Sequence, residues 1–225
     1  MELSDRTLSV LKNYANINPN IVVNQGSELK TVSVAKNVFS RTSLVEEFPV
    51  NFGIYDLFEF LGVLSLVDKP TLNFEKDYVT VSDTTGRTSI KYFFSDPDML
   101  TSPSKDIIFP NSEVNFVLDT DTLSKIKRAS SALGHNEISI TPNDGCIRLS
   151  VLDTKDGTSN TFSIDVEGTY EDGVDFNFIL NVNNLKTVNE DFEVHISSKL
   201  ISQFRSQQSD IEYFIALEKT STYGS

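Results

Sequence analysis

The chain has 225 residues, of which 39% are apolar and 23% charged, a composition typical of globular proteins that excludes a disordered or fibrous chain. The formal net charge of −13 would repel nucleic acid, so DNA binding requires a local cluster of basic side chains. No apolar run reaches the roughly 20 residues that span a bilayer, and the first residues lack a signal-peptide pattern, so we expect a cytoplasmic protein.

Four helices are predicted, two in each half of the chain. They cover residues 4–15, 56–66, 120–133 and 183–188. The first has Ser4 as its N-cap, and the third begins after Asp119 and ends at Gly134, a residue suited to a left-handed C-terminal stop. Both carry an apolar stripe on one side and polar, partly basic residues on the other, as helices that cover a sheet do.

The remaining sequence predicts short strands separated by turns. Alternating or clustered β-forming residues occur at 72–74, 78–81, 90–94, 137–141, 147–151, 161–166, 176–180, 192–197, 200–204 and 212–217. Turn-forming residues at 83–86 and 142–145 join two pairs of these strands into hairpins. Cys146 is the single cysteine, so it forms no internal disulfide, and we expect it half-buried in a strand.

A polar stretch marked by prolines separates the two halves. Residues 95–106 contain Pro97 and Pro103. Because proline interrupts both helices and strand ladders, we expect this stretch to be an exposed connector. The chain is therefore divided into domains 1–108 and 109–225, each expected to run strand, amphipathic helix, strands, helix, strands.

Catalytic motifs are not found in the sequence. The two histidines, His135 and His195, have no neighbouring catalytic partner and are expected to be packed or solvated. No nucleophile elbow, P-loop, dinucleotide fingerprint or metal-ligand cluster is present. Residues 153–158 resemble a calcium loop only faintly, because the closing glutamate is missing, and a hairpin connection is favoured. The sequence thus predicts a protein that is not an enzyme and has no cofactor or metal site.

Four segments resemble, in the same order along the chain, those of the sliding clamps, or DNA polymerase accessory proteins, of T-even-like tailed phages. They are Val10–Asn18, Ile54–Val67, Phe176–Asn181 and Phe214–Glu218, and the second is the most specific. The similarity is loose between them, notably across 19–47 and 150–175.

The resemblance implies an α+β fold of two similar processivity-clamp domains, with antiparallel sheets outside and helices inside, assembled as a closed homotrimeric ring around duplex DNA. Such a ring is a DNA polymerase processivity factor, which slides without reading sequence and keeps the replicative polymerase at its template. The implied partners are an ATP-driven clamp loader, the carboxy-terminal tail of the polymerase and late-transcription factors, in the cytoplasm of an infected bacterium. Basic residues on inward helices would reconcile DNA binding with an acidic exterior.

Carried onto this chain, the resemblance assigns three sets of residues. The DNA-facing residues are Arg6, Lys12, Lys125, Lys127, Arg128 and Lys186. The subunit interface lies at two strand edges and uses Ile90, Tyr92, Phe93, Phe162 and Ile164. The partner-peptide pocket uses Ile107, Ile108 and Phe109. In the alternative interpretations, the basic residues lie on solvated helix faces, and the apolar triplet begins the first strand of the second domain and is buried.

A different class of function stays open on the residues alone. A β-rich structural or adhesive phage protein, such as a tail or capsid-decoration component, would also have an acidic surface. Such a protein has no reason to place basic-faced amphipathic helices at matching points in both halves. The helical pattern therefore favours the clamp, although the helix at 56–66 carries no basic residue.

Overall fold

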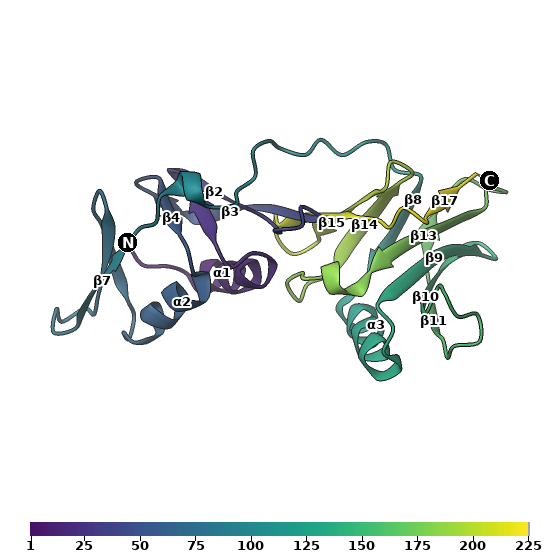
Figure 1. Ribbon diagram of the computed structural model, residues 1–225, viewed down its shortest axis with the longest axis horizontal. Coiled ribbons are helices and arrows are strands. Elements are labelled where there is room, and N and C mark those ends of the chain that lie inside the picture. Colours follow the sequence, from purple (N-terminus) through teal and green to yellow (C-terminus); the bar gives the residue numbers. More distant parts are fainter. Residues whose placement is uncertain (225) are drawn as a thin grey trace. The chain divides into compact units, whose positions relative to one another are not determined.

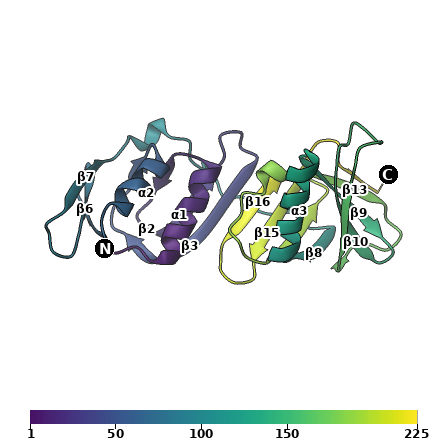
Figure 2. The same ribbon diagram turned by 90° about the horizontal axis from the view of Figure 1, so that it is seen from below.

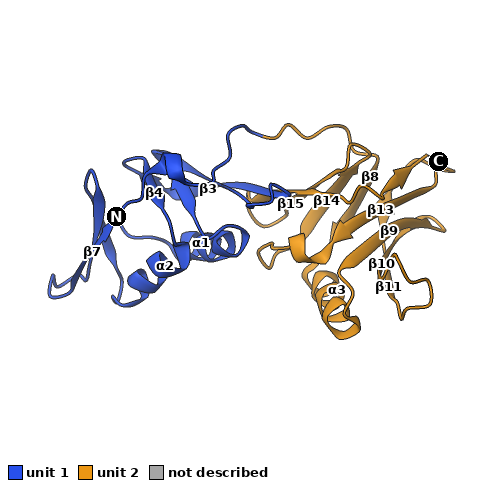
Figure 3. Ribbon diagram, viewed as in Figure 1, with its two compact units in different colours: residues 1–106 blue, residues 107–225 orange. Residues whose placement is uncertain are grey.

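A computed structural model describes residues 1–224 of the chain (Figure 1). They form two compact units, residues 1–106 and residues 107 onward, which Figure 3 shows in different colours. Each unit is built of antiparallel strands and helices, so the chain has the α+β class predicted from the sequence.

The first unit combines two α-helices with antiparallel strands. The helices are α1 (Asp5–Ile17) and α2 (Leu57–Ser65), and a 3-10 turn, η1 (Pro97–Met99), follows near the end of the unit. The strands are β1 (Ile21–Val23), β2 (Gly26–Val32), β3 (Val38–Phe48), β4 (Phe52–Ile54), β5 (Thr71–Phe74), β6 (Tyr78–Ser82) and β7 (Ser89–Phe93). β1 pairs with β4, β2 pairs with β3, and β5, β6 and β7 form a sheet in which β7 is an edge. Figure 2 shows α1 and α2 side by side in this unit.

The first helix forms where its cap predicts. Ser4 caps α1 by accepting a hydrogen bond of 3.2 Å from the backbone N–H of Thr7. On the buried side of α1, the hydroxyl of Tyr14 lies 3.0 Å from that of Ser40 on β3. The helix predicted at 4–15 is confirmed and runs slightly further along the chain.

The second helix is also confirmed, and it exposes an apolar face. The carboxylate of Asp56 accepts hydrogen bonds of 2.9 and 3.1 Å from the backbone N–H groups of Phe58 and Glu59. Its buried side includes Phe60, but the ring of Phe58 is 53% exposed. Because α2 carries no basic residue, its exposed face has no positive charge to offer a phosphate.

As far as residue 224, the second unit combines one α-helix with two antiparallel sheets. The helix is α3 (Thr120–Leu133), and a 3-10 turn, η2 (Val182–Asn184), occurs later. The strands are β8 (Val114–Leu118), β9 (Glu137–Asn143), β10 (Cys146–Leu152), β11 (Phe162–Val166), β12 (Gly168–Thr169), β13 (Phe176–Asn181), β14 (Phe192–Ser197), β15 (Ile201–Ser206), β16 (Glu212–Ala216) and β17 (Thr222–Tyr223). Neighbouring strands follow the orders β12-β8-β14-β15-β16 and β11-β10-β9-β13-β17.

The caps of α3 agree with the sequence. Asp119 accepts a hydrogen bond of 2.7 Å from the backbone N–H of Thr122, and Gly134 ends the helix with φ of 72°. Leu123 and Ile126 lie on the buried side. The helix predicted at 120–133 is therefore confirmed at both ends.

The hairpin between β9 and β10 is tighter than its turn residues suggest. Asp144 and Gly145 have φ of 45° and 83°, the two left-handed residues that a two-residue type I′ turn needs. Whereas the sequence predicts a turn over 142–145, the ladder continues to the pair Asn143 and Cys146. Cys146 is half-buried on β10, as expected.

The prediction of a helix at 183–188 is wrong. In its place, η2 is followed by an irregular segment that leads into β14. The side chain of Asn181 accepts a hydrogen bond of 3.0 Å from the backbone N–H of Asn183, a local bond that competes with helix formation. Leu185 and Val188 are buried, so packing holds the segment without a helix, whose nucleation is costly over so few residues.

The strands of the first half are the least visible in the sequence. β1 to β4 are not predicted. In β2 and β3 the apolar alternation is weakened because inward positions carry hydroxyl residues such as Thr31, Ser40 and Thr42. β8 forms before α3, where a strand is expected at the start of the second half, although its range is not predicted. The strand expected before the first helix does not form, since the chain makes only an isolated bridge from Glu2 to Thr71 there.

The connector is exposed over only part of its length. Leu100 is 9% exposed. The backbone N–H of Thr101 donates to the side chain of Asn20 (3.1 Å), and its carbonyl accepts from the side chain of Asn18 (3.2 Å). Residues 102–112 form no helix or strand. The expected exposure therefore holds for most of residues 95–106, but not at Leu100 and Thr101, which are anchored on the first unit.

Candidate nucleic-acid interface and partner surfaces

α3 presents its basic residues on the side opposite its buried stripe. Lys125 and Arg128 are exposed there, and Lys127 is half-buried on one flank. The ammonium of Lys125 forms an ion pair of 2.5 Å with Asp121, one turn earlier. Because this pair is exposed, it contributes little to stability and leaves Lys125 able to meet another anion.

A hollow of about 320 Å³ lies beside α3 and the segment before β14. It is lined by Leu123, Ser124, Lys127, Arg128, Ser131, Thr187, Val188 and Asn189. Burial in this wall lowers the pKa of Lys127 below its ordinary value. The Thr187 hydroxyl is buried and has no hydrogen-bond partner among the described residues. Two cations and several hydroxyls around one hollow suit an anion such as a phosphate group.

The remaining predicted DNA-facing residues are dispersed. Lys186 is exposed, but it lies on the irregular segment after η2 rather than on a helix. On α1, Lys12 is exposed and Arg6 half-buried, and the exposed Asp5 offsets part of their charge. α3 is thus the most basic helix of the chain.

The first predicted interface strand, β7, divides its residues between two faces. Phe93 is 64% exposed and its ring lies 5.6 Å from that of Tyr78, over which the Lys91 ammonium sits at 4.1 Å. Tyr92 faces inward, with its ring 5.1 Å from that of Phe60 on α2. Burial raises the pKa of Tyr92 to about 12. Ile90, like Tyr92, is half-buried.

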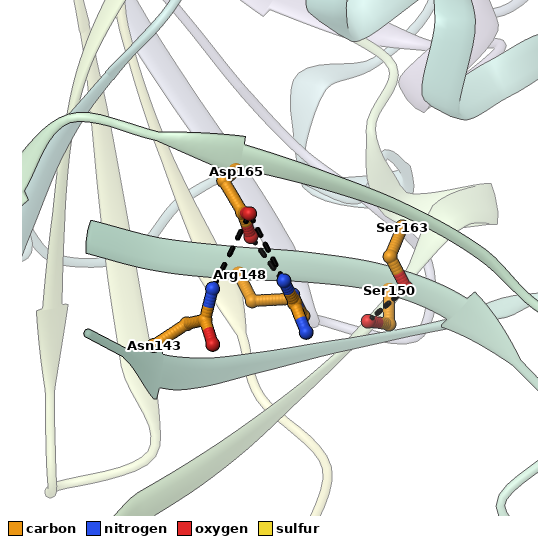
Figure 4. Close-up of polar contacts among 5 residues, drawn as sticks. All are labelled: Asn143, Arg148, Ser150, Ser163 and Asp165. Carbon is orange, nitrogen blue, oxygen red and sulfur yellow. Dashed lines mark hydrogen bonds and ion pairs between the residues drawn. The ribbon is translucent and has the colours of Figure 1, made fainter.

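The second predicted interface strand, β11, is also an edge. Figure 4 shows the polar contacts between its side chains and those of the neighbouring strands. On its exposed face, Arg148 donates two hydrogen bonds of 2.8 and 3.0 Å to the carboxylate of Asp165, and Ser150 bonds to Ser163. These side chains join directly opposite residues of β10 and β11.

The other face of β11 is apolar. Phe162 and Ile164 alternate with the polar side chains and are half-buried. The predicted interface residues therefore lie on the inner face of this edge strand, whose outer face is tied to β10 by polar contacts.

The apolar triplet of the connector does not begin a strand. β8 starts at Val114, and Ile108 is 92% exposed, so the interpretation in which the triplet is buried is wrong for Ile108. Ile107 and Phe109 are half-buried. The Phe109 ring lies against rings of the second unit, with centroids 6.5 Å from His195 and 6.3 Å from Phe214.

Sequence reasoning missed this aromatic environment. His195 on β14 and Phe214 on β16 are brought close by strand register, which no local pattern reports. It also missed the exposed apolar residues around α2, where Tyr55 and Leu66 are 70% and 72% exposed. The sequence does carry a signal for these exposed apolar residues, because a helix over 56–66 has apolar side chains on most sides and cannot bury them all.

Within residues 1–224, no group of three or more histidine, cysteine or acidic side chains is placed to hold a metal ion. In the same part of the chain, every helix is too short or too polar to cross a bilayer.

The fold is that of the DNA clamps. The chain aligns with the proliferating cell nuclear antigen of Entamoeba histolytica at a TM-score of 0.67 and 13% identity, over 94% of each chain. It aligns with the A. fulgidus clamp of the same kind, solved with the C-terminal region of FEN-1, at a TM-score of 0.70 and 13% identity over 98% of each chain.

Sequence comparison is more specific than the fold. Residues 4–100 match the family described as DNA polymerase processivity factor, and residues 115–219 match the gp45 sliding clamp, C terminal. The sliding clamp of Vibrio phage KVP40 is 32% identical over 97% of this chain and 99% of its own length. That of Escherichia phage RB69 is 29% identical over 99% of both. The chain belongs to the phage sliding clamps, a family of DNA polymerase processivity factors that act as accessory proteins rather than as enzymes.

Proposed function

We propose that this clamp acts as a closed ring of three copies around duplex DNA and tethers the replicative polymerase to its template. Its two clamp domains would be residues 1–108 and 109–225. The observation that carries the proposal is the basic face of α3 in a chain of net charge −13 that belongs to the sliding clamps. A local cationic face on an acidic protein is what a ring needs to admit DNA at one surface and repel it elsewhere.

The DNA-facing set is Arg6, Lys12, Lys125, Lys127, Arg128 and Lys186. Phosphate contacts carry no sequence information, so side chains of this kind hold DNA loosely and allow sliding. Retention then comes from topology, because a closed ring leaves DNA only by opening or by reaching an end. Loading requires an ATP-driven clamp loader as a partner.

The ring would close head to tail between β7 of one copy and β11 of the next. Both strands are edges with unpaired backbone groups, and both carry apolar side chains, in Ile90, Tyr92, Phe93, Phe162 and Ile164. An edge of this kind is a template for pairing with another chain. A heterologous contact between two different edges generates a ring when its rotation closes.

Partner tails would dock at Ile107, Ile108 and Phe109. The exposure of Ile108 supports this assignment, because an unpartnered apolar side chain in an irregular segment suits a short peptide. The occupants would be the tails of the polymerase and of late-transcription factors, in the cytoplasm of an infected bacterium.

The test of DNA tethering is a triple variant, Lys125→Ala with Lys127→Ala and Arg128→Ala, in a processivity assay with polymerase and clamp loader over a range of salt. We expect shorter products and a weaker dependence on salt concentration, because about one unit of the salt slope disappears with each lost phosphate contact.

The matched control removes the same charge elsewhere, through Lys76→Ala, Lys155→Ala and Lys219→Ala, all exposed and off the helices. Processivity equal to wild type in the α3 variant at every salt concentration would remove these residues from the DNA surface. Equal losses in both triple variants would mean that net charge, and not the α3 face, governs DNA retention.

A further inference from the structure

The Phe109 ring rests on a row of side chains that crosses four strands. Asn115 of β8 lies opposite His195 of β14, His195 lies opposite Gln203 of β15, and Gln203 lies opposite Phe214 of β16. Directly opposed residues of antiparallel strands project from the same face of a sheet. The row therefore forms a floor on one sheet face, and Phe109 covers its His195 and Phe214 portion.

The segment that supplies Phe109 is weakly held. Residues 102–112 form no helix or strand. Asp106 is tied to β2 by an ion pair of 2.8 Å with Lys30, and the chain joins the sheet again where the Glu113 N–H donates to the Ile196 carbonyl (2.9 Å), so Phe109 lies in the stretch between these two anchors. Ile108, next to Phe109, is 92% exposed. Few contacts therefore oppose withdrawal of the Phe109 ring from the floor.

The floor also contains an unused hydrogen-bonding atom. The Nδ1 of His195 lies 2.7 Å from the Asn115 side-chain oxygen, which can only accept, so Nδ1 carries the proton. In the neutral ring Nε2 is then an acceptor. This Nε2 is buried without a hydrogen-bond partner among the described residues, and the Glu193 carboxylate, at 4.0 Å, offers no proton. A buried polar atom without a partner is a site where a ligand can supply one.

We propose that Phe109 is an internal stand-in for an aromatic side chain of a partner peptide, which displaces it from the floor formed by Asn115, His195, Gln203 and Phe214 and donates a hydrogen bond to Nε2 of His195. The inference rests on the proposed docking of partner tails at the connector and assigns Phe109 a different part in it. Ile108 remains a contact for the incoming tail, whereas Phe109 competes with it.

The Phe109 ring that covers the floor indicates which kind of partner group would replace it. An aromatic ring fits the floor, as Phe109 demonstrates, and two neighbouring rings favour tilted aromatic packing over an aliphatic substitute. A short peptide is suited to the site because it brings both a ring and backbone N–H donors. Self-occupancy lowers the apparent affinity for such a peptide in proportion to the fraction of time the floor is free.

The chain has no tryptophan, so Phe109→Trp introduces a single indole as a reporter. The probe is a short capped peptide with a single aromatic residue in a glycine and serine context, compared with the same peptide carrying alanine in its place. We expect the aromatic peptide to move the indole emission saturably towards that of a solvated indole and the alanine peptide to leave it unchanged. Binding of the aromatic peptide, detected by calorimetry, with no change in emission would overturn the inference while leaving the tail site in place.

A second variant removes the competitor. Phe109→Ala is expected to bind the aromatic peptide about 3- to 10-fold more tightly than wild type, since the floor is then always free. The matched control is Met99→Ala, which truncates another exposed apolar side chain, on η1. Weaker binding by Phe109→Ala would identify Phe109 as a wall of the site and overturn the inference. Absence of binding by wild type and both Phe109 variants would count against the tail site itself, and with it the inference.

Discussion

The hydroxyl of Thr7, in the first turn of α1, donates a hydrogen bond of 2.6 Å to the carboxylate of Glu46 on β3. The second carboxylate oxygen accepts from the backbone N–H of Ser4. Burial alone would raise the pKa of Glu46, but these hydrogen bonds lower it below its ordinary value. Since the charge also lies at the N-terminus of a helix, it complements the helix dipole.

We predict that Glu46→Gln lowers the free energy of unfolding by about 1–2 kcal/mol at neutral pH, because charge-assisted hydrogen bonds are lost. The contribution is present above the unfolded-state pKa of Glu46, near 4.5, and is lost as pH falls through the lower folded-state value. Urea denaturation from pH 7 to pH 3 measures it. The exposed neighbour provides the control, Glu47→Gln. A wild-type advantage that stays constant down to pH 3 would contradict this account.

The β7 edge can be tested by its exposed ring. Phe93→Glu should leave the unit folded, because the side chain is 64% exposed, but should place a charge in the proposed subunit contact. We expect native mass spectrometry to give three copies of 25.1 kDa for wild type and single copies for the variant. Val34→Glu, at a 67% exposed position in the turn before β3, is the control. Trimers that persist with Phe93→Glu would place the interface elsewhere.

The anchoring of the connector depends on a glycine. The Ser95 N–H donates to the Gly53 carbonyl (2.9 Å), and a Cβ on Gly53 would lie 2.6 Å from the Ser95 carbonyl oxygen and 2.7 Å from Leu100 Cδ1. Gly53→Ala should therefore displace this segment and lower the free energy of unfolding by about 1–3 kcal/mol.

The matched control, Gly62→Ala, is expected to raise the free energy of unfolding instead of lowering it. Gly62 lies within α2 with open space around it, and alanine there should stabilise the helix by about 0.5–1 kcal/mol. Denaturant titration of both variants provides the comparison. A Gly53→Ala protein as stable as wild type would show that residues 95–100 can move aside without loss.

His195 makes stability depend on pH in the opposite direction to a histidine that gains an anionic partner. Burial lowers the pKa of His195, Glu193 raises it, Arg205 lowers it, and the outcome lies below the ordinary value of 6.5. The folded protein thus binds the proton less readily than the unfolded chain. Stability is complete above about pH 6.5 and falls as pH drops through that value towards the folded-state pKa.

We predict that His195→Gln removes this part of the pH dependence and that His135→Gln does not. The unfolding free energies of the three proteins between pH 8 and pH 5 give the comparison. Parallel curves for wild type and His195→Gln would show that the imidazole is not the titrating group.

The elements that can be predicted from the sequence are those whose stabilising contacts lie between residues close together in the chain. α1 and α3 follow from Ser4, Asp119 and Gly134, whose capping contacts lie within a few residues of the chain. The prediction of a helix at 183–188 is wrong because non-local contacts hold that segment: Leu185 and Val188 are buried, and the Val188 N–H donates to the Tyr213 hydroxyl on β16 (3.1 Å).

The residues of the candidate site also divide into a set that could be predicted from the sequence and a set that could not. The basic residues of α3 are adjacent in sequence, so their common face could be predicted. The floor beneath Phe109 could not, because Asn115, His195 and Phe214 meet through the registers of four strands and contribute no pattern at short range. Predicting it would require the pairing of the strands beforehand.

The polar contacts on the outer face of β11 have a geometric consequence for assembly. Arg148 with Asp165 and Ser150 with Ser163 fasten the edge strand to β10 at two points, so its free backbone groups present one fixed ladder. A slip of two residues would move an added strand by about 7 Å along the edge. In the proposed ring, three copies joined with that offset would not close and would form an open helical filament. In the proposed assembly through β11, these two side-chain contacts therefore help to decide between a closed ring and an open filament.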